Sequence, residues 1–359
     1  MQTTDFIFSK AFQSIEKTSF SASSPSNIAL VKYWGKEDIQ IPKNTSISFT
    51  LSNCKTETRL ELSQKKEDVQ HIKVYLDKVE TPSFVPKIQK FFKLIQSYCP
   101  YLDNYDVKVH THNTFPHSSG IASSASGMSA LALCIMQLEK QLDPQMNDSF
   151  FWKKTSFLAR LGSGSACRSL SGGLVVWGEH QDIPNSSQLY GVAYKQNIHP
   201  DFLDFQDCIL LVDQGEKKVS STIGHSLMNG HPFAEKRFEQ AEENISKIAE
   251  ILQSGDLKSF IRLVESEALT LHGMMMTSNP YFILMSPKTL EVINDIWKFR
   301  DETKIPVCFT LDAGANVHVL YPKKHKANVE VFIENELKQY CENGKYILDE
   351  VGNGASITN

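Results

Sequence analysis

Hydrophobic residues recur along this chain with two different periods, which predict helices and strands in different places. Residues 85–99 carry apolar side chains at helical spacing, namely Ile88, Phe91, Phe92 and Ile95. Residues 56–63 and 105–112 instead alternate apolar and polar positions, which is typical of strands with one buried face. The pattern therefore predicts a mixed chain rather than an all-helical or all-strand one.

The order of the expected elements changes near residue 198. Up to that point, strands are interspersed with helices expected at 85–99, 129–142 and 148–161, with Gly162 directly past the end of the last one. Beyond it we expect a strand, three long helices, two short strands around a turn, a last helix and strand, and a polar tail: 207–213, 234–253, 256–273, 286–302, 307–311, 317–321, 328–341 and 345–351. Strands and helices do not alternate regularly, so the expected class is α+β, with domains at 1–197 and 198–359.

Composition and charge narrow the function classes. The chain has 359 residues, 41% of them hydrophobic, with 37 Lys and Arg against 41 Asp and Glu and a net charge of −4. These values indicate a globular protein and argue against a general binder of nucleic acid or membrane surfaces, which needs concentrated basic charge. No apolar run is long enough to span a bilayer, and the first residues do not resemble a secretory signal.

Cysteine and histidine give little sign of a metal site. The 7 cysteines form no CxxC pair, and their apolar contexts favour reduced core residues of a cytosolic protein. His110 and His112 are two apart on an expected strand and could share a face. No third ligand accompanies them, so a metal site there is a weak hypothesis.

A glycine- and serine-rich loop at 116–127 precedes a long apolar helix. Small residues let the backbone approach an anion closely, and a helix start supplies free N–H groups with a favourable dipole. Ser123 and Ser124 add hydroxyls that can bond a phosphate oxygen or ligate Mg²⁺. The loop lacks the GxxxxGK[ST] pattern of a P-loop, so it would be a different phosphate cradle, and a plain helix-capping connector is the alternative.

Three further segments carry candidate chemistry. Arg168 follows a small-residue turn at 162–167, where a guanidinium could bind a carboxylate or phosphate, although a surface arginine is equally compatible. Asp312 lies between two apolar segments and must be hydrogen-bonded or paired with a cation, or else initiates a turn. Lys32 and Lys36 flank Tyr33 and Trp34, and two such ammonium groups could neutralise one polyanion. Together these groups predict a single polyanion site.

The motifs then define a resemblance. The phosphate loop is similar to that of the GHMP small-molecule kinase superfamily. Within it, the chain resembles the mevalonate diphosphate decarboxylases through these segments: NIALVKYWGK, NTSISFTLS, PHSSGIASSASG, GSGSACRS, VSST and TLDAGAN. The resemblance runs from about Ser21 to Tyr321, and the combination of KYWGK with SGSACRS is its most specific part.

The resemblance implies a fold and a reaction. It implies a GHMP-kinase-like two-domain fold, with an N-terminal ribosomal-protein-S5-like domain that binds ATP and a C-terminal ferredoxin-like domain. It also implies ATP- and Mg²⁺-dependent decarboxylation of mevalonate 5-diphosphate to isopentenyl diphosphate, in a cytoplasmic enzyme that is often a homodimer. A mevalonate phosphate decarboxylase, a mevalonate 3-kinase and a non-catalytic binding protein of the same fold are the alternatives.

The same resemblance assigns roles to residues. Asp312 would face the C3 hydroxyl as base or positioning anion, Lys32 would pair with it, and Arg168 would hold the substrate carboxylate. Residues expected to contact the substrate or line its site are Asn27, Tyr33, Trp34, Lys36, Ser163, Ser165, Ser220 and Ser221. Residues expected around ATP are Asn113, Ser118, Ser119, Gly120, Ser123 and Ser124, with Ser124 also a ligand of Mg²⁺.

Some positions depart from the family pattern. The turn reads DAGAN where relatives usually have DAGPN, and Thr222 stands where some bacterial relatives carry an arginine for the diphosphate. None of these departures removes a catalytic group. We therefore expect them to change substrate affinity more than reaction type.

Overall fold

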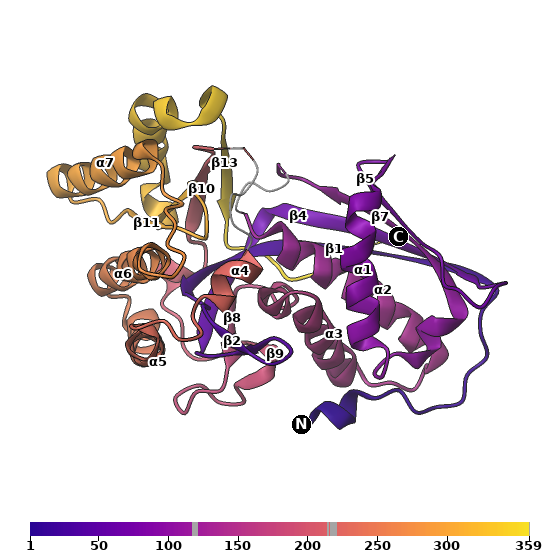
Figure 1. Ribbon diagram of the computed structural model, residues 1–359. Helices are drawn as coiled ribbons and strands as arrows, with labels where there is room; N and C mark the ends of the chain where they lie inside the picture. Colours follow the sequence, from indigo (N-terminus) through magenta and orange to yellow (C-terminus); the bar gives the residue numbers. More distant parts are fainter. Residues whose placement is uncertain (117–120, 214, 216–220, 359) are drawn as a thin grey trace.

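The protein has two halves, each built around its own antiparallel or mixed sheet (Figure 1). This computed structural model describes residues 1–116, 121–213, 215 and 221–358, and the side chains of residues 221 and 222 lie outside that description. The expected α+β class is confirmed, because the strands of each half pair among themselves and helices pack against them.

The first half is an eight-stranded sheet with the order β14-β1-β4-β7-β5-β6, to which β8 and β9 attach through β4. Its strands are β1 (Lys17–Val31), β4 (Ser46–Gln64), β5 (Ile72–Leu76), β6 (Val79–Glu80), β7 (Tyr105–Asn113), β8 (Leu174–Gly178), β9 (Ser187–Ala193) and β14 (Ser356–Thr358). The long β4 pairs with β7 through its second half and with β8 through its first. A small hairpin, β2 (Lys36–Glu37) with β3 (Ile41–Pro42), follows β1.

Three helices cover one face of this sheet (Figure 1). They are α1 (Val85–Ile95), α2 (Ser123–Leu142) and α3 (Asp148–Gly162). The helical spacing in α1 is confirmed, since its buried residues are those that the sequence placed on one face: Ile88, Phe91, Phe92 and Ile95. α2 is buried along most of its length, because it lies between the sheet and α3.

The second half is a four-stranded sheet with the order β11-β12-β10-β13. Its strands are β10 (Gln206–Leu210), β11 (Cys308–Thr310), β12 (Val317–Tyr321) and β13 (Tyr346–Glu350), and its helices are α4 (Ser221–Ser226), α5 (Ala234–Ser254), α6 (Leu257–Met276), α7 (Pro287–Thr303) and α8 (Lys326–Phe332). Alternate strand residues face opposite sides. Ile209 and Leu320 pack in one core with α5 and α6, whereas Cys208 and Val319 pack in another with α7 and α8.

A continuous apolar core joins the two halves. Ile28 and Phe49 of the first sheet belong to the same cluster as Ile209 and the helices α5 and α6. Near this core, the Asp349 carboxylate of β13 accepts hydrogen bonds from three successive backbone N–H groups of β4, at Ser52, Asn53 and Cys54, over 2.7–2.8 Å. Residues at the ends of β1 and β11 are therefore held in a fixed relation to each other.

Three details differ from the expected elements. The last helix is interrupted, because α8 passes into a π-helical turn at Ile333–Leu337 and then a 3₁₀ turn. Strand β9 begins within the expected polar loop, and β14, in the expected polar tail, pairs with β1 of the first sheet. The domain boundary at 197/198 stays a prediction.

Two further observations concern the whole chain. All seven cysteines are buried and free, and burial raises the pKa of the Cys167 thiol to about 12. Among the described residues, no helix is both long and apolar enough to cross a membrane.

Candidate functional site

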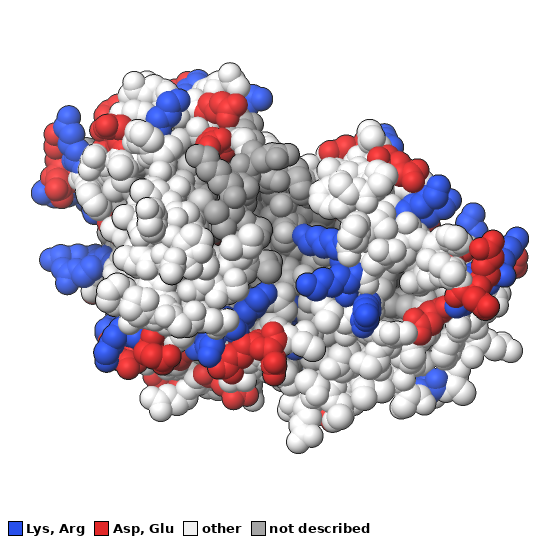
Figure 2. Space-filling model, in the orientation of Figure 1, with Lys and Arg blue, Asp and Glu red and all other residues white. Residues whose placement is uncertain are grey.

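A cleft of about 420 Å³ opens between the two halves of the molecule. Figure 2 shows Lys and Arg side chains gathered beside the hollow at this position. The cleft is lined by residues from both halves, including Asn27, Lys32, Tyr33, Trp34, Lys36, Lys87, Ser123, Ser124, Ser163, Ser165, Arg168, His225 and Asp312. Segments far apart in the sequence thus converge on one space, as the motifs predicted.

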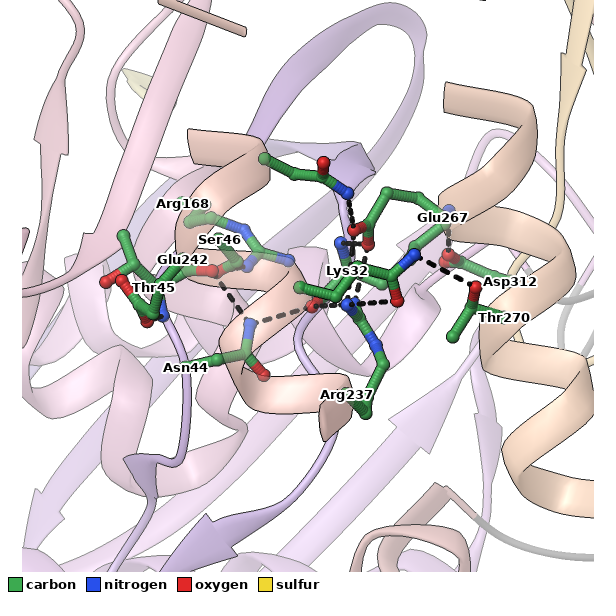
Figure 3. Close-up of polar contacts among 12 residues, drawn as sticks. Lys32, Asn44, Thr45, Ser46, Arg168, Arg237, Glu242, Glu267, Thr270 and Asp312 are labelled. Carbon is green, nitrogen blue, oxygen red and sulfur yellow. Dashed lines mark hydrogen bonds and ion pairs between the residues drawn. The ribbon is translucent and has the colours of Figure 1, made fainter. Parts of the chain in front are cut away.

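Lys32 and Asp312 both line this cleft and form an ion pair, although 280 positions separate them (Figure 3). Lys32 Nζ lies 3.0 Å from Asp312 Oδ1, and the two side chains are 2% and 28% exposed, respectively. Burial lowers the pKa of Lys32, against the opposing effect of Asp312. The pair thus combines a buried cation with a carboxylate that is open to the cleft.

Arg168 is buried beside this pair, in the 3₁₀ turn Gly164–Ser169 that follows α3. Its Nε donates to Asn27 Oδ1 at 3.3 Å and one terminal nitrogen donates to Ser46 Oγ, while its guanidinium lies 5.9 Å from the ring centre of Trp177. Burial lowers the pKa of Arg168 from its usual value, partly offset by the nearby Asp312. A fixed guanidinium of this kind is suited to a carboxylate ligand.

The first turn of α2 brings two hydroxyls to the cleft, and α1 brings a lysine beside them. Ala122, directly before the helix, has a left-handed backbone (φ 46°), a conformation that a non-glycine residue adopts only under local constraint. Ser123 and Ser124 follow it, and Lys87 Nζ donates to Ser124 Oγ at 3.0 Å. Lys87 is exposed on α1, but partial desolvation of its ammonium group by the surrounding protein lowers its pKa. Helix N–H groups, hydroxyls and a cation together form a phosphate-binding arrangement.

Aromatic rings close another wall of the cleft. The His225 ring lies 4.3 Å from the Tyr33 ring and 4.6 Å from the Trp34 ring, and its Nδ1 accepts the Gly35 N–H at 3.0 Å. Burial, together with the nearby positive charges, lowers the pKa of His225 to about 3, so the ring is neutral at pH 7. Tyr33 Oη is buried and has no hydrogen-bond partner within the described residues, which marks it as a donor for a ligand.

Gly164 is required for this arrangement. A Cβ added there would approach Trp177 to 2.7 Å and Tyr33 Oη to 3.0 Å. Any side chain would therefore displace one of the two aromatic rings.

Lys36 also lines the cleft. Its Nζ donates to Gln40 Oε1 at 3.1 Å, and burial together with the charge of Lys90 lowers its pKa. A second cavity of about 80 Å³, more apolar, adjoins the cleft and shares Lys87, Ser123 and Ser124 with it. Asn113 lines this second cavity rather than the main cleft.

The structure brings together most of the sequence-predicted residues. Those that line the main cleft are Asn27, Lys32, Tyr33, Trp34, Lys36, Ser123, Ser124, Ser163, Ser165, Arg168 and Asp312. Predictions for Ser118, Ser119, Gly120 and Ser220, and for the side chain of Ser221, lie outside the described residues. Asn113 is the exception among the described predicted residues, because it lines the adjoining second cavity.

Sequence reasoning missed Lys87, His225 and His272. Lys87 lies on the amphipathic helix α1, where a lysine is ordinary, and no local pattern marks it as a site residue. His225 sits four residues after the predicted Ser221, and that proximity was the only available sign. His272 lies in the interior of α6.

The histidine pair on β7 has other partners. His112 Nδ1 lies 2.5 Å from Asp77 Oδ1 on the exposed sheet face, and His110 stacks on Tyr75 at 4.6 Å. Over residues 1–116, 121–213, 215 and 221–358, no group of three or more His, Cys, Asp and Glu side chains is arranged to hold a metal ion.

Comparison with protein-family models finds two matches. Residues 24–188 match the diphosphomevalonate decarboxylase-like N-terminal domain, and residues 208–354 match the mevalonate 5-diphosphate decarboxylase C-terminal domain.

Curated relatives indicate the same family as these two domain matches. The chain is 30% identical over 323 residues to diphosphomevalonate decarboxylase from Debaryomyces hansenii, a match that covers 86% of this chain and 81% of the relative. It is 30% identical to the Saccharomyces cerevisiae enzyme of that name, over 87% of this chain and 80% of the relative.

Solved structures show the same relationship. Mevalonate diphosphate decarboxylase from Staphylococcus aureus superposes with a TM-score of 0.81 and 28% identity, covering 96% of this chain and 98% of that one. The complex of MDDEF with MVAPP, AMPPCP and magnesium has a TM-score of 0.81 and 28% identity, covering 96% of this chain and 99% of that one. These neighbours confirm the expected GHMP-kinase-like two-domain fold.

Proposed function

Because this chain belongs to the diphosphomevalonate decarboxylase family, we propose that its cleft carries out the family's reaction with the residues described above. The reaction is the ATP-dependent decarboxylation of mevalonate 5-diphosphate to isopentenyl diphosphate. The observation that carries the proposal is the Lys32–Asp312 pair, which faces a cleft that also contains Arg168 and the start of α2. Neither a monophosphate decarboxylase nor a 3-kinase is favoured by the relatives.

The chemistry requires activation of a poor leaving group. Hydroxide does not leave a tertiary carbon readily, so the C3 hydroxyl oxygen first attacks the γ-phosphorus of ATP and ADP departs. The C3–O bond then breaks with release of phosphate, and the electrons of the C–CO₂ bond form the double bond as CO₂ leaves. In such a sequence the protein contributes mainly positioning and electrostatic stabilisation.

Asp312 and Lys32 suit the phosphoryl-transfer step. The Asp312 carboxylate faces the hydroxyl, as base or as positioning anion, and a loose transition state does not demand a strong base. Lys32 holds that carboxylate and places positive charge beside the transferring phosphoryl group. Its burial strengthens the interaction, because little water screens it.

Arg168 and the aromatic wall suit substrate binding. The Arg168 guanidinium lines the cleft, is oriented by Asn27 and Ser46, and suits the substrate carboxylate. Tyr33 Oη and Lys36 suit the 5-diphosphate, together with Ser220 and Ser221 by family resemblance. Ser163 and Ser165 line the same space.

The start of α2 is suited to bind the phosphates of ATP. Ser123, Ser124 and Lys87 offer hydroxyls and a cation, and the adjoining apolar cavity, with Asn113 in its wall, suits the nucleoside end. By family resemblance, Ser118, Ser119 and Gly120 belong to the same phosphate loop. Since the described residues offer no cluster of acidic ligands, Mg²⁺ would take most of its ligands from phosphate oxygens and one from Ser124, and it would neutralise phosphate charge.

The test uses the purified chain with Mg-ATP and, separately, mevalonate 5-diphosphate, mevalonate 5-phosphate and mevalonate. We expect equimolar ADP and CO₂ from the diphosphate alone. ADP without CO₂ would support a kinase instead. Absence of ADP with all three compounds would support a non-catalytic binding protein.

By family resemblance we also propose a cytoplasmic homodimer, and light scattering should then give about twice the 40.5 kDa of one chain.

A further inference from the structure

Helix α6 contacts the main chain at both members of the Lys32–Asp312 pair. Glu267 Oε2 accepts the Lys32 N–H at 2.8 Å, and His272 Nε2 donates to the Asp312 carbonyl oxygen at 3.1 Å. Both side chains are almost fully buried, at 0% and 1% exposure. One rigid element thus touches two chain segments that are distant in the sequence.

Lys32 needs such a partner because its strand has ended. β1 stops at Val31, which is the last residue of that strand paired with β4. The Lys32 N–H goes instead to Glu267, and its carbonyl accepts from Arg237 at 3.2 Å and from Asn44 Nδ2 at 3.0 Å (Figure 3). Buried backbone groups require partners, and here side chains of the second half provide two of the three.

The Glu267–Arg237 ion pair that makes these contacts is itself completely enclosed. Arg237 donates to both oxygens of Glu267, at 3.1 and 2.6 Å, and Asn244 Nδ2 donates to Oε1 at 2.6 Å. Such a pair contributes little net stability relative to apolar side chains of the same volume, because desolvation opposes it. Its directional bonds to Lys32 are what apolar residues could not supply.

His272 acts on the other member of the pair. β11 ends at Thr310, so Asp312 lies beyond the strand ladder, and its carbonyl is held by the His272 ring. Burial lowers the pKa of His272 to about 4, so at pH 7 it donates as a neutral ring without adding positive charge beside Lys32.

We propose that Glu267, with Arg237, and His272 are positioning residues that fix the Lys32 and Asp312 side chains relative to each other. This inference rests on the proposed function. Misplacement of a reacting group by about 1 Å can cost about 100-fold in rate, so loss of either contact should lower kcat more than it changes KM.

The first test compares His272→Phe with His272→Gln. Phenylalanine removes the donor, whereas glutamine can present an N–H to the Asp312 carbonyl. We expect His272→Phe to lower kcat by about 10-fold or more with both KM values within about 3-fold of wild type, and His272→Gln to recover most of the loss. Equal kcat values for wild type and His272→Phe would overturn the role of His272.

The second test uses paired substitutions that remove a whole ion pair. Glu267→Met with Arg237→Met removes the two contacts that the second half makes to the Lys32 main chain, and Glu267→Gln with Arg237→Met restores an acceptor for the Lys32 N–H. Glu139→Met with Lys154→Met is the matched control, because that buried pair, at 2.6 Å, lies in the core of the first half. All variants are assayed at a temperature where circular dichroism shows them folded.

We expect the variant with Glu267→Met and Arg237→Met to lose about 10-fold or more in kcat. The variant with Glu267→Gln and Arg237→Met should recover part of this loss. The control variant should keep the wild-type kcat. Equal losses in the Glu267 and Glu139 variants would overturn the proposal, since they would indicate general loosening. An inactive wild-type chain would instead reject the proposed function, which keeps the two failures distinct.

Discussion

Two buried lysines, Lys154 and Lys32, each form an ion pair with a carboxylate, and the two carboxylates differ in their exposure to solvent. Lys154 and Glu139 lie within the first half at 0% and 1% exposure, and Glu139 also accepts from Tyr101 Oη at 2.8 Å, while Lys154 also donates to the Tyr98 carbonyl. Lys32 is equally buried, but its partner Asp312 is 28% exposed and lines the cleft.

The difference shows that burial of an ion pair does not by itself indicate a functional site. The Lys154–Glu139 pair connects α2 to α3. Its polar atoms bond to other groups of the protein, so they are not available to a ligand. A pair of which one member faces a cavity can act on a bound molecule while the other member holds it in place. We expect substitutions to separate these two roles.

The largest effect should come from Asp312→Asn. The substitution removes the negative charge and basic site that we propose to face the C3 hydroxyl, but it changes the side-chain volume little. We expect kcat to fall by about 10³-fold or more, with ATP affinity close to wild type. Steady-state ADP release and calorimetric titration with a non-hydrolysable ATP analogue measure the two quantities. Near-normal turnover would remove Asp312 from the reaction.

Replacing Lys154 or Lys32 by methionine should show directly that the two ion pairs have different roles. Lys154→Met leaves Glu139 buried without its cation, so we expect a loss of about 3–5 kcal/mol in unfolding free energy with kcat retained in the folded fraction. Lys32→Met should lower kcat by about 10²–10³-fold and cost less stability, because water reaches Asp312. Urea unfolding and ADP release measure both variants. Equal losses of stability together with equal kcat values in the two variants would contradict the different roles of the two ion pairs.

Lys87→Ala should have a smaller, substrate-selective effect. The ammonium lies beside Ser124 at the start of α2, so its removal should raise KM for ATP by about 10-fold, the value of one charge-assisted hydrogen bond, and leave KM for mevalonate 5-diphosphate nearly unchanged. Lys247→Ala, on the exposed face of α5, is the control and should change neither constant. A selective rise in KM for the diphosphate would assign Lys87 to the other ligand.

The smallest effect should be on stability in mild acid. His225 has a folded pKa of about 3, below its usual 6.5, so the unfolded chain binds more protons and stability should fall as pH drops from 6.5 towards 3. Glu139 acts in the opposite direction, because burial raises its folded pKa. His225→Gln should therefore narrow the difference in urea midpoint between pH 7 and pH 5. An unchanged difference would contradict a neutral buried ring.

Much of the local structure followed from the sequence because periodic patterns report which face of an element is buried. Residues 317–321 were expected as a strand and form β12, and the helix expected at 148–161 is α3, which extends one residue further, to Gly162. Strand β14 was missed, because a short exposed segment carries no apolar period and is held only by its pairing with β1.

The sequence by itself determined the chemical inventory: Asp312, Lys32, Arg168 and the serines before a long helix, in motifs specific enough to indicate the family. Only the tertiary structure decided which groups act on them. Glu267 and His272 reach their partners across 235 and 40 positions, and Lys87 reaches Ser124 across 37. Such contacts depend on how helices pack on sheets, and a side chain inside a helix gives no local sign of what it will touch.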